Sequence, residues 1–150
     1  LRILSGLSFD IPAGKAVEQI SGSFHDMAIT DDVLRDIYRR AALVVVPLKD
    51  VLQPTGYSVT LQAMACGKPV ILSDIRGLWD REAFVSGENC ILVPPGDTGA
   101  LETAIATLLN DDVLRRKMGA AARETAERVF ALARMDTSIR ELVTAAQKAD

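Results

Sequence analysis

The segment from Gln53 to Asp74, QPTGYSVTLQAMACGKPVILSD, constrains the fold most, because it orders a glycine-containing loop, a short helix, a second glycine turn and an apolar strand. Pro54, Thr55 and Gly56 fit poorly inside a helix, so we expect a helix to begin just after them. Gly67 predicts where that helix ends. This order is typical of half a nucleotide site, since the free amides and the dipole of a helix N-terminus favour a phosphate.

Strand and helix patterns alternate along the chain, which predicts a parallel sheet with helices on both faces. Short apolar runs at 2–5, 43–47 and 70–72 are typical of strands, and a further short strand is expected at 16–20. The runs at 43–47 and 70–72 show no polar alternation, which predicts strands buried on both faces. The sequence therefore indicates an α/β fold.

Helix boundaries and helix faces follow from the same patterns. Thr30 and Asp97 precede helical segments and are expected to be N-caps. Apolar residues at helical spacing predict the buried face of the helix after Gly56 and a second apolar face on the last helix. The first set is Tyr57, Leu61, Met64 and Ala65, and the second is Ile139, Leu142, Val143 and Ala146.

Composition excludes several classes of function. The chain has 150 residues, of which 49% are hydrophobic, enough for the core of one domain. Its 17 basic and 20 acidic residues give a net charge of −3 without a long basic run, which argues against nucleic acid as a partner. The sequence contains no apolar run of the length that spans a membrane, so no transmembrane segment is expected.

The chain also lacks the patterns of a metal site. Cys66 and Cys90 have neither CxxC nor histidine spacing, and they are typical of reduced thiols in a cytoplasmic protein. No Asp-x-Asp pair follows a predicted strand, so no metal is predicted. His25 is the only histidine, and we expect it to lie on the surface.

Two segments resemble one enzyme family. The letters QAMACGKPV from Gln62 to Val70 are similar to the family's EAMA-GKPV, and Ser86–Asn89 with Ile91–Asp97 are similar to its dG-nG-LV-PGD turn, strand and helix cap. The family is the donor-binding domain of retaining GT-B glycosyltransferases, usually called group 1 or family 4. The resemblance covers roughly residue 28 to the C-terminus, and the combination is more specific than either glycine motif alone.

The resemblance implies a Rossmann-like domain that binds a nucleoside-diphosphate sugar, such as a UDP- or GDP-sugar, for transfer to an acceptor with retention. No cofactor besides this substrate is implied. The chain starts at Leu1 without a methionine, so we expect one partial donor domain over 1–150, which lacks the family's first strand–helix unit and its N-terminal acceptor domain. Catalysis by this piece alone is not expected, and the family's last helix crosses to the other domain, which predicts partial exposure around Leu142 and Val143.

The candidate binding residues surround the start of the helix after Gly56. Gly56, Tyr57 and Ser58 are the expected diphosphate cradle. Lys49 is the nearest basic side chain in the preceding loop, although a solvated surface role is favoured for it. Polar residues beyond that loop, Ser73, Asp74, Arg76 and Asp80, are weaker candidates, and Trp79 fits the core as well as a ligand stack.

Two positions depart from the family pattern. The family places two glutamates eight residues apart, one for the donor sugar and one for the ribose, and this chain has Pro54 and Gln62 there. Gln62 can still bond a ribose hydroxyl through its neutral amide, while the sugar role passes to Gln53, to Thr55, to backbone or to nothing. We therefore keep a non-catalytic nucleotide-sugar-binding or interaction domain as the alternative. A nonhydrolysing nucleotide-sugar epimerase ranks lower, because few acid–base groups are present.

Overall fold

A computed structural model describes residues 2–5, 18–21 and 30–147, and the chain divides into two compact units, 1–34 and 35–150. In the first unit, β1 (Arg2–Ser5) pairs in parallel with β2 (Glu18–Ser21). The predicted strand at 2–5 is confirmed. The strand expected at 16–20 is found from Glu18 and extends to Ser21, while residues 16 and 17, like His25, lie outside the described residues.

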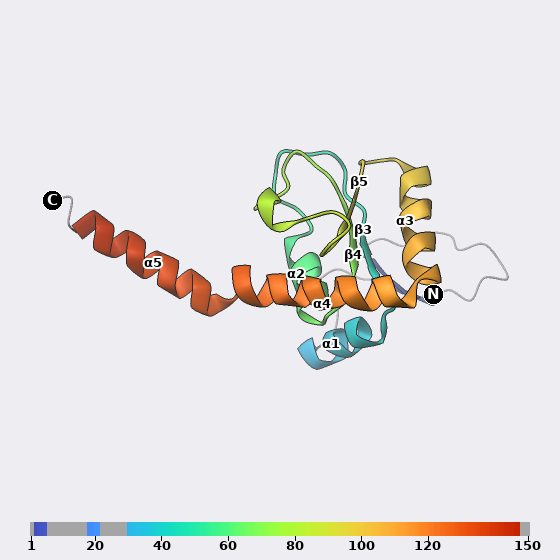
Figure 1. The fold of residues 1–150 in the computed structure, drawn as a ribbon, viewed down its shortest axis with the longest axis horizontal. Coiled ribbons are helices and arrows are strands. Elements are labelled where there is room, and N and C mark those ends of the chain that lie inside the picture. The colour runs from blue at the N-terminus through green and yellow to red at the C-terminus, as the bar shows by residue number, and fades with distance from the viewer. Residues whose placement is uncertain (1, 6–17, 22–29, 148–150) are drawn as a thin grey trace. The chain divides into compact units, whose positions relative to one another are not determined.

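The second unit contains a parallel three-stranded sheet in the order β3–β4–β5 (Figure 1). Its strands are β3 (Val44–Val46), β4 (Val70–Ser73) and β5 (Ile91–Val93). In Figure 1, α2 (Tyr57–Ala65) and α3 (Thr98–Asn110) lie on opposite sides of these strands. The predicted α/β class with a parallel sheet is confirmed.

The remaining elements of the second unit are helical. The helix α1 (Asp31–Arg40) crosses the boundary between the two units and leads into β3. After β4 comes a short 3₁₀ helix, η1 (Arg81–Ala83). After α3, the helices α4 (Asp112–Val129) and α5 (Leu132–Gln147) complete the described chain.

The two central strands differ in burial. All four residues of β4 are buried, as its unbroken apolar sequence predicted. In β3, only Val46 is buried, whereas Val44 and Val45 are half-buried, so the prediction of a strand buried on both faces is wrong for β3. The reason is that α2 packs on β3, whereas α3, on the other side of the sheet, packs chiefly on β4 and β5.

The buried face of α2 agrees with the prediction only in part, at Met64 and at the half-buried Leu61. Thr60, Ala63 and Met64 are buried, whereas Tyr57 and Ala65 are exposed. The helix α2 packs on α4 as well as on the sheet, and Gly119 of α4 lies against the carbonyl oxygen of Gly67 in the turn after α2. Helical spacing alone does not show which face of a helix such neighbours will cover.

Helix ends are capped as the sequence indicated. The Thr30 hydroxyl accepts a bond from Val33 N (3.5 Å), and Asp97 accepts one from Ala100 N (2.8 Å). Asp111 caps α4 in the same way, through Leu114 N at 2.8 Å. These bonds satisfy amides that a helix leaves unpaired at its start.

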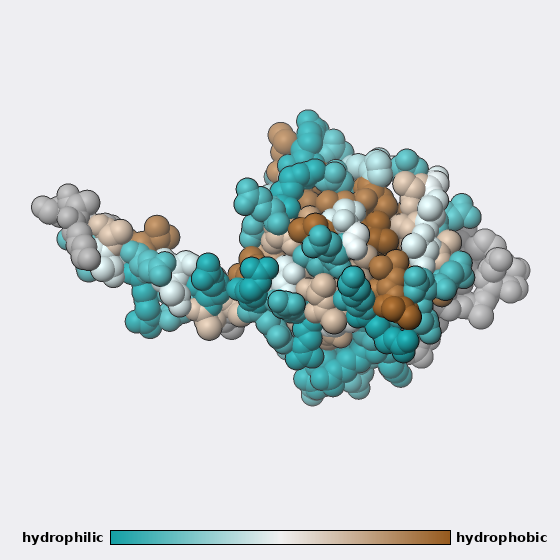
Figure 2. Space-filling model, viewed as in Figure 1, coloured by the Kyte–Doolittle hydropathy of each residue, from teal (hydrophilic) through white to brown (hydrophobic). Residues whose placement is uncertain are grey.

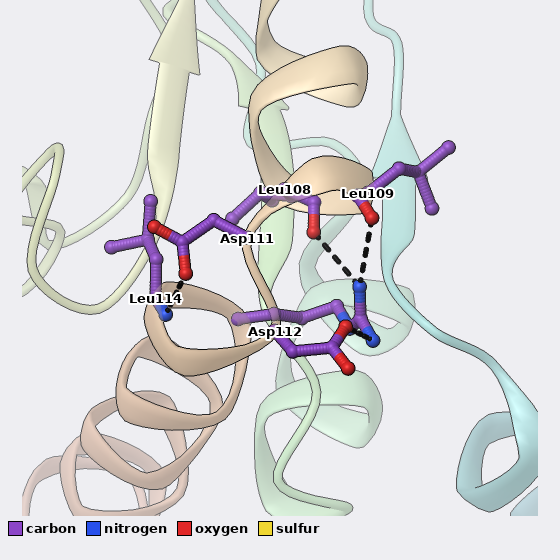
Figure 3. A network of polar contacts seen from close by, with 6 residues as sticks. Leu108, Leu109, Asp111, Asp112 and Leu114 are labelled. Atoms are coloured by element: carbon purple, nitrogen blue, oxygen red, sulfur yellow. Dashed lines mark hydrogen bonds and ion pairs between the residues drawn. The ribbon is translucent and has the colours of Figure 1, made fainter.

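The junction between α3 and α4 contains a polar network (Figure 3). Arg115 Nη1 donates to the carbonyl oxygens of Leu108 (3.0 Å) and Leu109 (3.4 Å) at the end of α3. The Nη2 atom of Arg115 forms an ion pair with the Asp112 carboxylate. The guanidinium therefore caps α3 from the first turn of α4 and fixes the turn between them.

The last helix exposes its apolar residues. Met135, Ile139, Leu142 and Val143 on α5 are each more than half exposed, with Leu142 at 71%. This agrees with the exposure that the family resemblance predicted around Leu142 and Val143. None of these side chains contributes to the buried core of the second unit.

Candidate functional site

The loops that follow β3 and β4 bind to each other at the carboxyl end of the sheet. Leu48 N donates to Ser73 Oγ (3.0 Å), and Gly77 N donates to the carbonyl oxygen of Val51 (2.8 Å). Parallel sheets place ligand sites beyond this end of their strands. The expectation that both loops border one site agrees with these contacts.

Gly77 is required for this contact between loops. A Cβ atom at Gly77 would lie 2.5 Å from both the carbonyl carbon and the carbonyl oxygen of Leu52. Real side chains do not approach backbone that closely, so only glycine allows the two loops to pack together here. The sequence analysis missed this glycine, because its partner lies 25 residues earlier in the chain.

Asp50 and Arg76 join the same two loops. The Asp50 carboxylate accepts bonds from Arg76 N and Arg76 Nε, each at 3.0 Å. The bond from the Arg76 backbone amide lowers the pKa of Asp50 most, partial desolvation opposes it, and the guanidinium lowers it further. The sequence analysis placed Arg76 near the site but missed Asp50.

We expect Asp50→Ala to speed amide hydrogen exchange at Arg76 and Gly77, because the substitution removes the carboxylate that holds the loops together. Asp50→Asn is the control, since its amide oxygen still accepts from Arg76 N. The pKa of Asp50 is lowered in the folded wild type, so the stabilisation from this contact is complete at pH values above the ordinary pKa of 3.8. It is lost as the pH falls through the folded-state pKa of Asp50. Equal exchange rates in all three proteins at pH 6 would contradict the role of Asp50.

The start of α2 is shaped by Gly56. This residue is the N-cap with φ 72°, in the left-handed region, and no side chain caps the helix. A Cβ at Gly56 would lie 2.9 Å from Val46 Cγ1 at the end of β3. The glycine thus allows both the turn and the close approach to β3, and it leaves the first-turn amides of α2 without a side-chain cap.

The other predicted residues surround this helix start in the sequence and differ in burial. Thr55 is half-buried in the loop, while Gln53 and Lys49 are exposed in the segment between β3 and α2. Ser58 is exposed in the first turn of α2. The assignment of these four residues to a phosphate or sugar stays a prediction. It is supported by their position in the chain just after the carboxyl end of β3.

An aromatic row runs from the helix start into the core. The ring of Tyr57, 46% exposed, lies 4.9 Å from that of Trp79, which lies 5.3 Å from Phe84. Phe84 in turn stacks on Phe130 at 6.0 Å. Trp79 is thus held between two aromatic neighbours, which favours a core role over ligand stacking for its ring.

Gln62 lies on α2, one to two turns after the helix start, and its side chain is exposed. Its amide oxygen accepts a bond from the hydroxyl of Tyr38 on α1 at 3.2 Å. By helical spacing, Tyr38 lies on the apolar face of α1. A hydroxyl on that face is a polar group whose partner cannot be read from helical spacing.

A small cavity of about 150 Å³ lies at the carboxyl ends of β3, β4 and β5, beside the first turn of α3. Its walls are mainly apolar, with Leu48, Ile71 and Leu101 among them, and Figure 2 shows hydrophobic atoms gathered between the strands and α3. Sites for drug-sized ligands usually enclose about 300–1,000 Å³. A nucleotide sugar would therefore need the open surface at the strand ends as well.

The two cysteines differ in accessibility, and both are free thiols. Burial, and secondarily the nearby Asp74 carboxylate, raises the pKa of Cys90 to about 12. We expect a disulfide reagent at pH 8 to modify only Cys66 in the folded chain and both cysteines in urea. Cys66→Ser should abolish labelling of the folded chain, and fast labelling of Cys90 in that variant would contradict its burial.

Comparison with known proteins places this geometry in a family. The family profile described as glycosyl transferases group 1 matches residues 12–111. The chain belongs to the group 1 glycosyltransferases. This match favours the glycosyltransferase interpretation over the epimerase.

Individual group 1 glycosyltransferases show the extent of the similarity. The chain is 43% identical over 70 residues to a phosphatidyl-myo-inositol mannosyltransferase of Mycobacterium leprae, covering 47% of this chain and 18% of that protein. It is 34% identical over 114 residues to a D-inositol 3-phosphate glycosyltransferase of Corynebacterium efficiens, covering 76% of this chain and 26% of that protein. The chain therefore spans only about a fifth to a quarter of the length of these curated relatives.

Solved structures of GT-B glycosyltransferases share the fold. A sucrose-phosphate synthase from Thermosynechococcus elongatus superposes with a TM-score of 0.69 at 30% identity, over 91% of this chain and 32% of that one. The Anabaena protein HepE in complex with UDP superposes with a TM-score of 0.71 at 23% identity, over 86% of this chain and 32% of that one. The predicted Rossmann-like half of a GT-B fold is confirmed.

None of the helices in the described residues is both long and apolar enough to cross a bilayer. Within the same residues, no three side chains of the His, Cys, Asp and Glu types form a group that could hold a metal ion.

Proposed function

We propose that this chain is part of the donor-binding domain of a glycosyltransferase that transfers a sugar from a nucleoside diphosphate to an acceptor with retention. The observation that carries the proposal is the start of α2, where the left-handed Gly56 leaves first-turn amides open at the carboxyl end of β3. Helix N-termini of this kind attract phosphate through their amides and dipole. Membership of the group 1 glycosyltransferases supports the same assignment.

The charges beside α2 are compatible with a bound diphosphate. Asp50 is paired with Arg76, and Asp74 Oδ1 is paired with Arg81 at 2.5 Å. These two carboxylates are thereby each balanced by a guanidinium, which reduces their repulsion of an incoming phosphate. In the proposed reaction, the helix amides stabilise the leaving diphosphate, an effect worth roughly 3 kcal/mol for one well-aimed donor.

We further propose that the donor domain is completed by other parts of the same cytoplasmic protein. The strand β3 consists only of valine, yet two of its three residues are only half-buried, and apolar parallel strands are usually buried on both faces. An additional strand and helix would bury these residues further, and a separate domain would supply the acceptor. The coverage is consistent with that arrangement, because this chain spans only 18% and 26% of the length of the two relatives described above.

A non-catalytic nucleotide-sugar-binding domain is the second candidate. It is favoured by Pro54 and Gln62, which provide no carboxylate before or within α2. A neutral amide bonds a ribose hydroxyl more weakly than a carboxylate does. An intact protein that binds nucleotide but transfers sugar to no acceptor would favour this candidate.

Calorimetric titration with UDP, GDP, ADP and their common sugar conjugates tests the proposal directly. We expect one nucleotide series to bind, with the diphosphate stronger than the monophosphate because the α2 amides contact the second phosphate. A folded, monodisperse chain that binds none of them would contradict a donor site on this chain. The same panel on the longer protein would then decide whether other segments hold the site.

A further inference from the structure

The loop that leads into α2, residues 47–56, is held chiefly by hydrogen bonds. None of its residues is buried, so apolar packing contributes little to its conformation. Four hydrogen bonds join this loop to residues 73–77, and the two loops run side by side in Figure 1. The conformation of the loop before α2 therefore depends on the loop after β4.

Asp50 accepts two of these four bonds. Its carboxylate bonds to Arg76 N and to Arg76 Nε, each at 3.0 Å. The two side chains are 43% and 66% exposed, and such exposed ion pairs add little to the stability of the whole fold. The bond to the backbone amide has a local effect, because it fixes the Asp50 loop relative to the main chain of the other loop.

Contacts between the two loops continue from Asp50 to the start of α2. The backbone of Leu52 lies against Gly77, and the ring of Tyr57 contacts the ring of Trp79. Between these contacts lies Gly56, the left-handed N-cap that leaves the first-turn amides of α2 without a side-chain cap. A shift of the loop at Asp50 is therefore expected to move the helix start as well.

We propose that Asp50 is a positioning residue, which holds the loop before α2 in the conformation that binds a nucleoside diphosphate. The inference rests on the proposed donor-binding function and adds preorganisation to it. Asp50 acts through the backbone amide of Arg76 and does not touch the ligand. Without this acceptor the loop samples other conformations, and the apparent affinity falls with the fraction of chains that can still bind.

Two double variants isolate the acceptor oxygen at position 50. The first, Asp50→Asn/Arg76→Gln, keeps an oxygen for the backbone amide of residue 76, and the second, Asp50→Ala/Arg76→Gln, removes it. Both variants lack the ion pair and keep the net charge of the wild type, so long-range attraction of the phosphates is matched. The ligand is whichever of UDP, GDP and ADP binds the wild-type chain. We expect the first variant to bind it within about twofold of the wild type and the second about fivefold more weakly.

The rate constants separate positioning from direct contact with the ligand. A smaller binding-competent fraction lowers the association rate constant and leaves the dissociation rate constant unchanged, whereas a lost ligand contact raises dissociation. Trp79 is the only tryptophan in the chain and lies beside Tyr57, so its fluorescence can follow binding in stopped-flow experiments. We expect the loss in the second variant to lie in association. Faster dissociation with unchanged association would overturn the positioning role.

Equal binding by the two variants would also overturn the proposal. If both bind like the wild type, the loop needs no acceptor at position 50. If both are weakened by the same factor, the guanidinium of Arg76 serves the ligand and the carboxylate of Asp50 does not position the loop.

Amide hydrogen exchange without ligand tests the loop contact separately. We expect faster exchange at the backbone amides of residues 76 and 77 in the second variant than in the first. If exchange differs in this way but no nucleoside diphosphate binds the wild type, the donor-site function fails and the ligand-positioning role of Asp50 fails with it. If a nucleoside diphosphate binds the wild type and both variants alike, the donor site stands and only the role of Asp50 is overturned.

Discussion

Gly119→Ala should lower the free energy of unfolding by about 2 kcal/mol, although alanine is the better helix former by about 1 kcal/mol. The new Cβ would lie 2.3 Å from the carbonyl oxygen of Gly67 and 3.4 Å from Pro69 Cδ. Gly67 cannot easily yield, because it turns the chain from α2 into β4 with φ 69°. Urea unfolding followed by circular dichroism measures the loss.

Gly99→Ala is the matched control for this experiment. Gly99 is also helical, but a Cβ there meets only Asp97 Oδ1 at an ordinary 3.5 Å. We expect this variant to be neutral or more stable by up to about 1 kcal/mol. If Gly119→Ala matched Gly99→Ala in stability, the close packing of α4 on the turn after α2 would be wrong.

Ser58→Asp should weaken nucleoside diphosphate binding about tenfold or more, by placing a carboxylate beside the amides that would hold the phosphates. Ser58 is exposed in the first turn of α2, so its substitution disturbs no core contact. An acidic residue in a first turn stabilises a helix by about 0.3–1 kcal/mol. Binding and stability should therefore change in opposite directions, as calorimetry and urea unfolding would record.

Ser58→Asn is the control, since it has nearly the shape of aspartate without the charge. Equal affinity of Ser58→Asp and Ser58→Asn for the same nucleotide would argue against a phosphate at this helix start. Gly56→Asp is a less direct test. Its Cβ would lie 2.9 Å from Val46 Cγ1 at a positive φ, so weakened binding could follow from a distorted loop.

Much of the fold was predictable because its signals are local. The apolar run of β4, the caps at Thr30 and Asp97, and the glycine turns around α2 follow from the preferences of neighbouring residues. The buried face of α2 was predicted correctly at Met64 but wrongly at Tyr57 and Ala65. Helical spacing identifies a set of apolar residues, but packing on α4 and the sheet decides which side chains are buried.

The candidate site was predictable only in part. The sequence placed Gly56, Tyr57 and Ser58 at a helix start, because loop glycines and helix N-termini have local signatures. It did not indicate that Asp50 joins Arg76, that Gly77 packs on Leu52, or that the Tyr38 hydroxyl donates to Gln62. Each of these contacts links residues about 25 positions apart, and no local pattern encodes such a pairing.

The sequence by itself therefore determined the α/β class, the order of loop, helix and strand around Gly56, and the resemblance to group 1 glycosyltransferases. These properties depend on periodicity, backbone preference and short motifs, which act over a few residues. Only the tertiary structure decided which face of α2 is buried, how the loops after β3 and β4 bind each other, and that Tyr38 bonds to Gln62. The physical reason is that close packing and hydrogen-bond direction arise between elements brought together by folding.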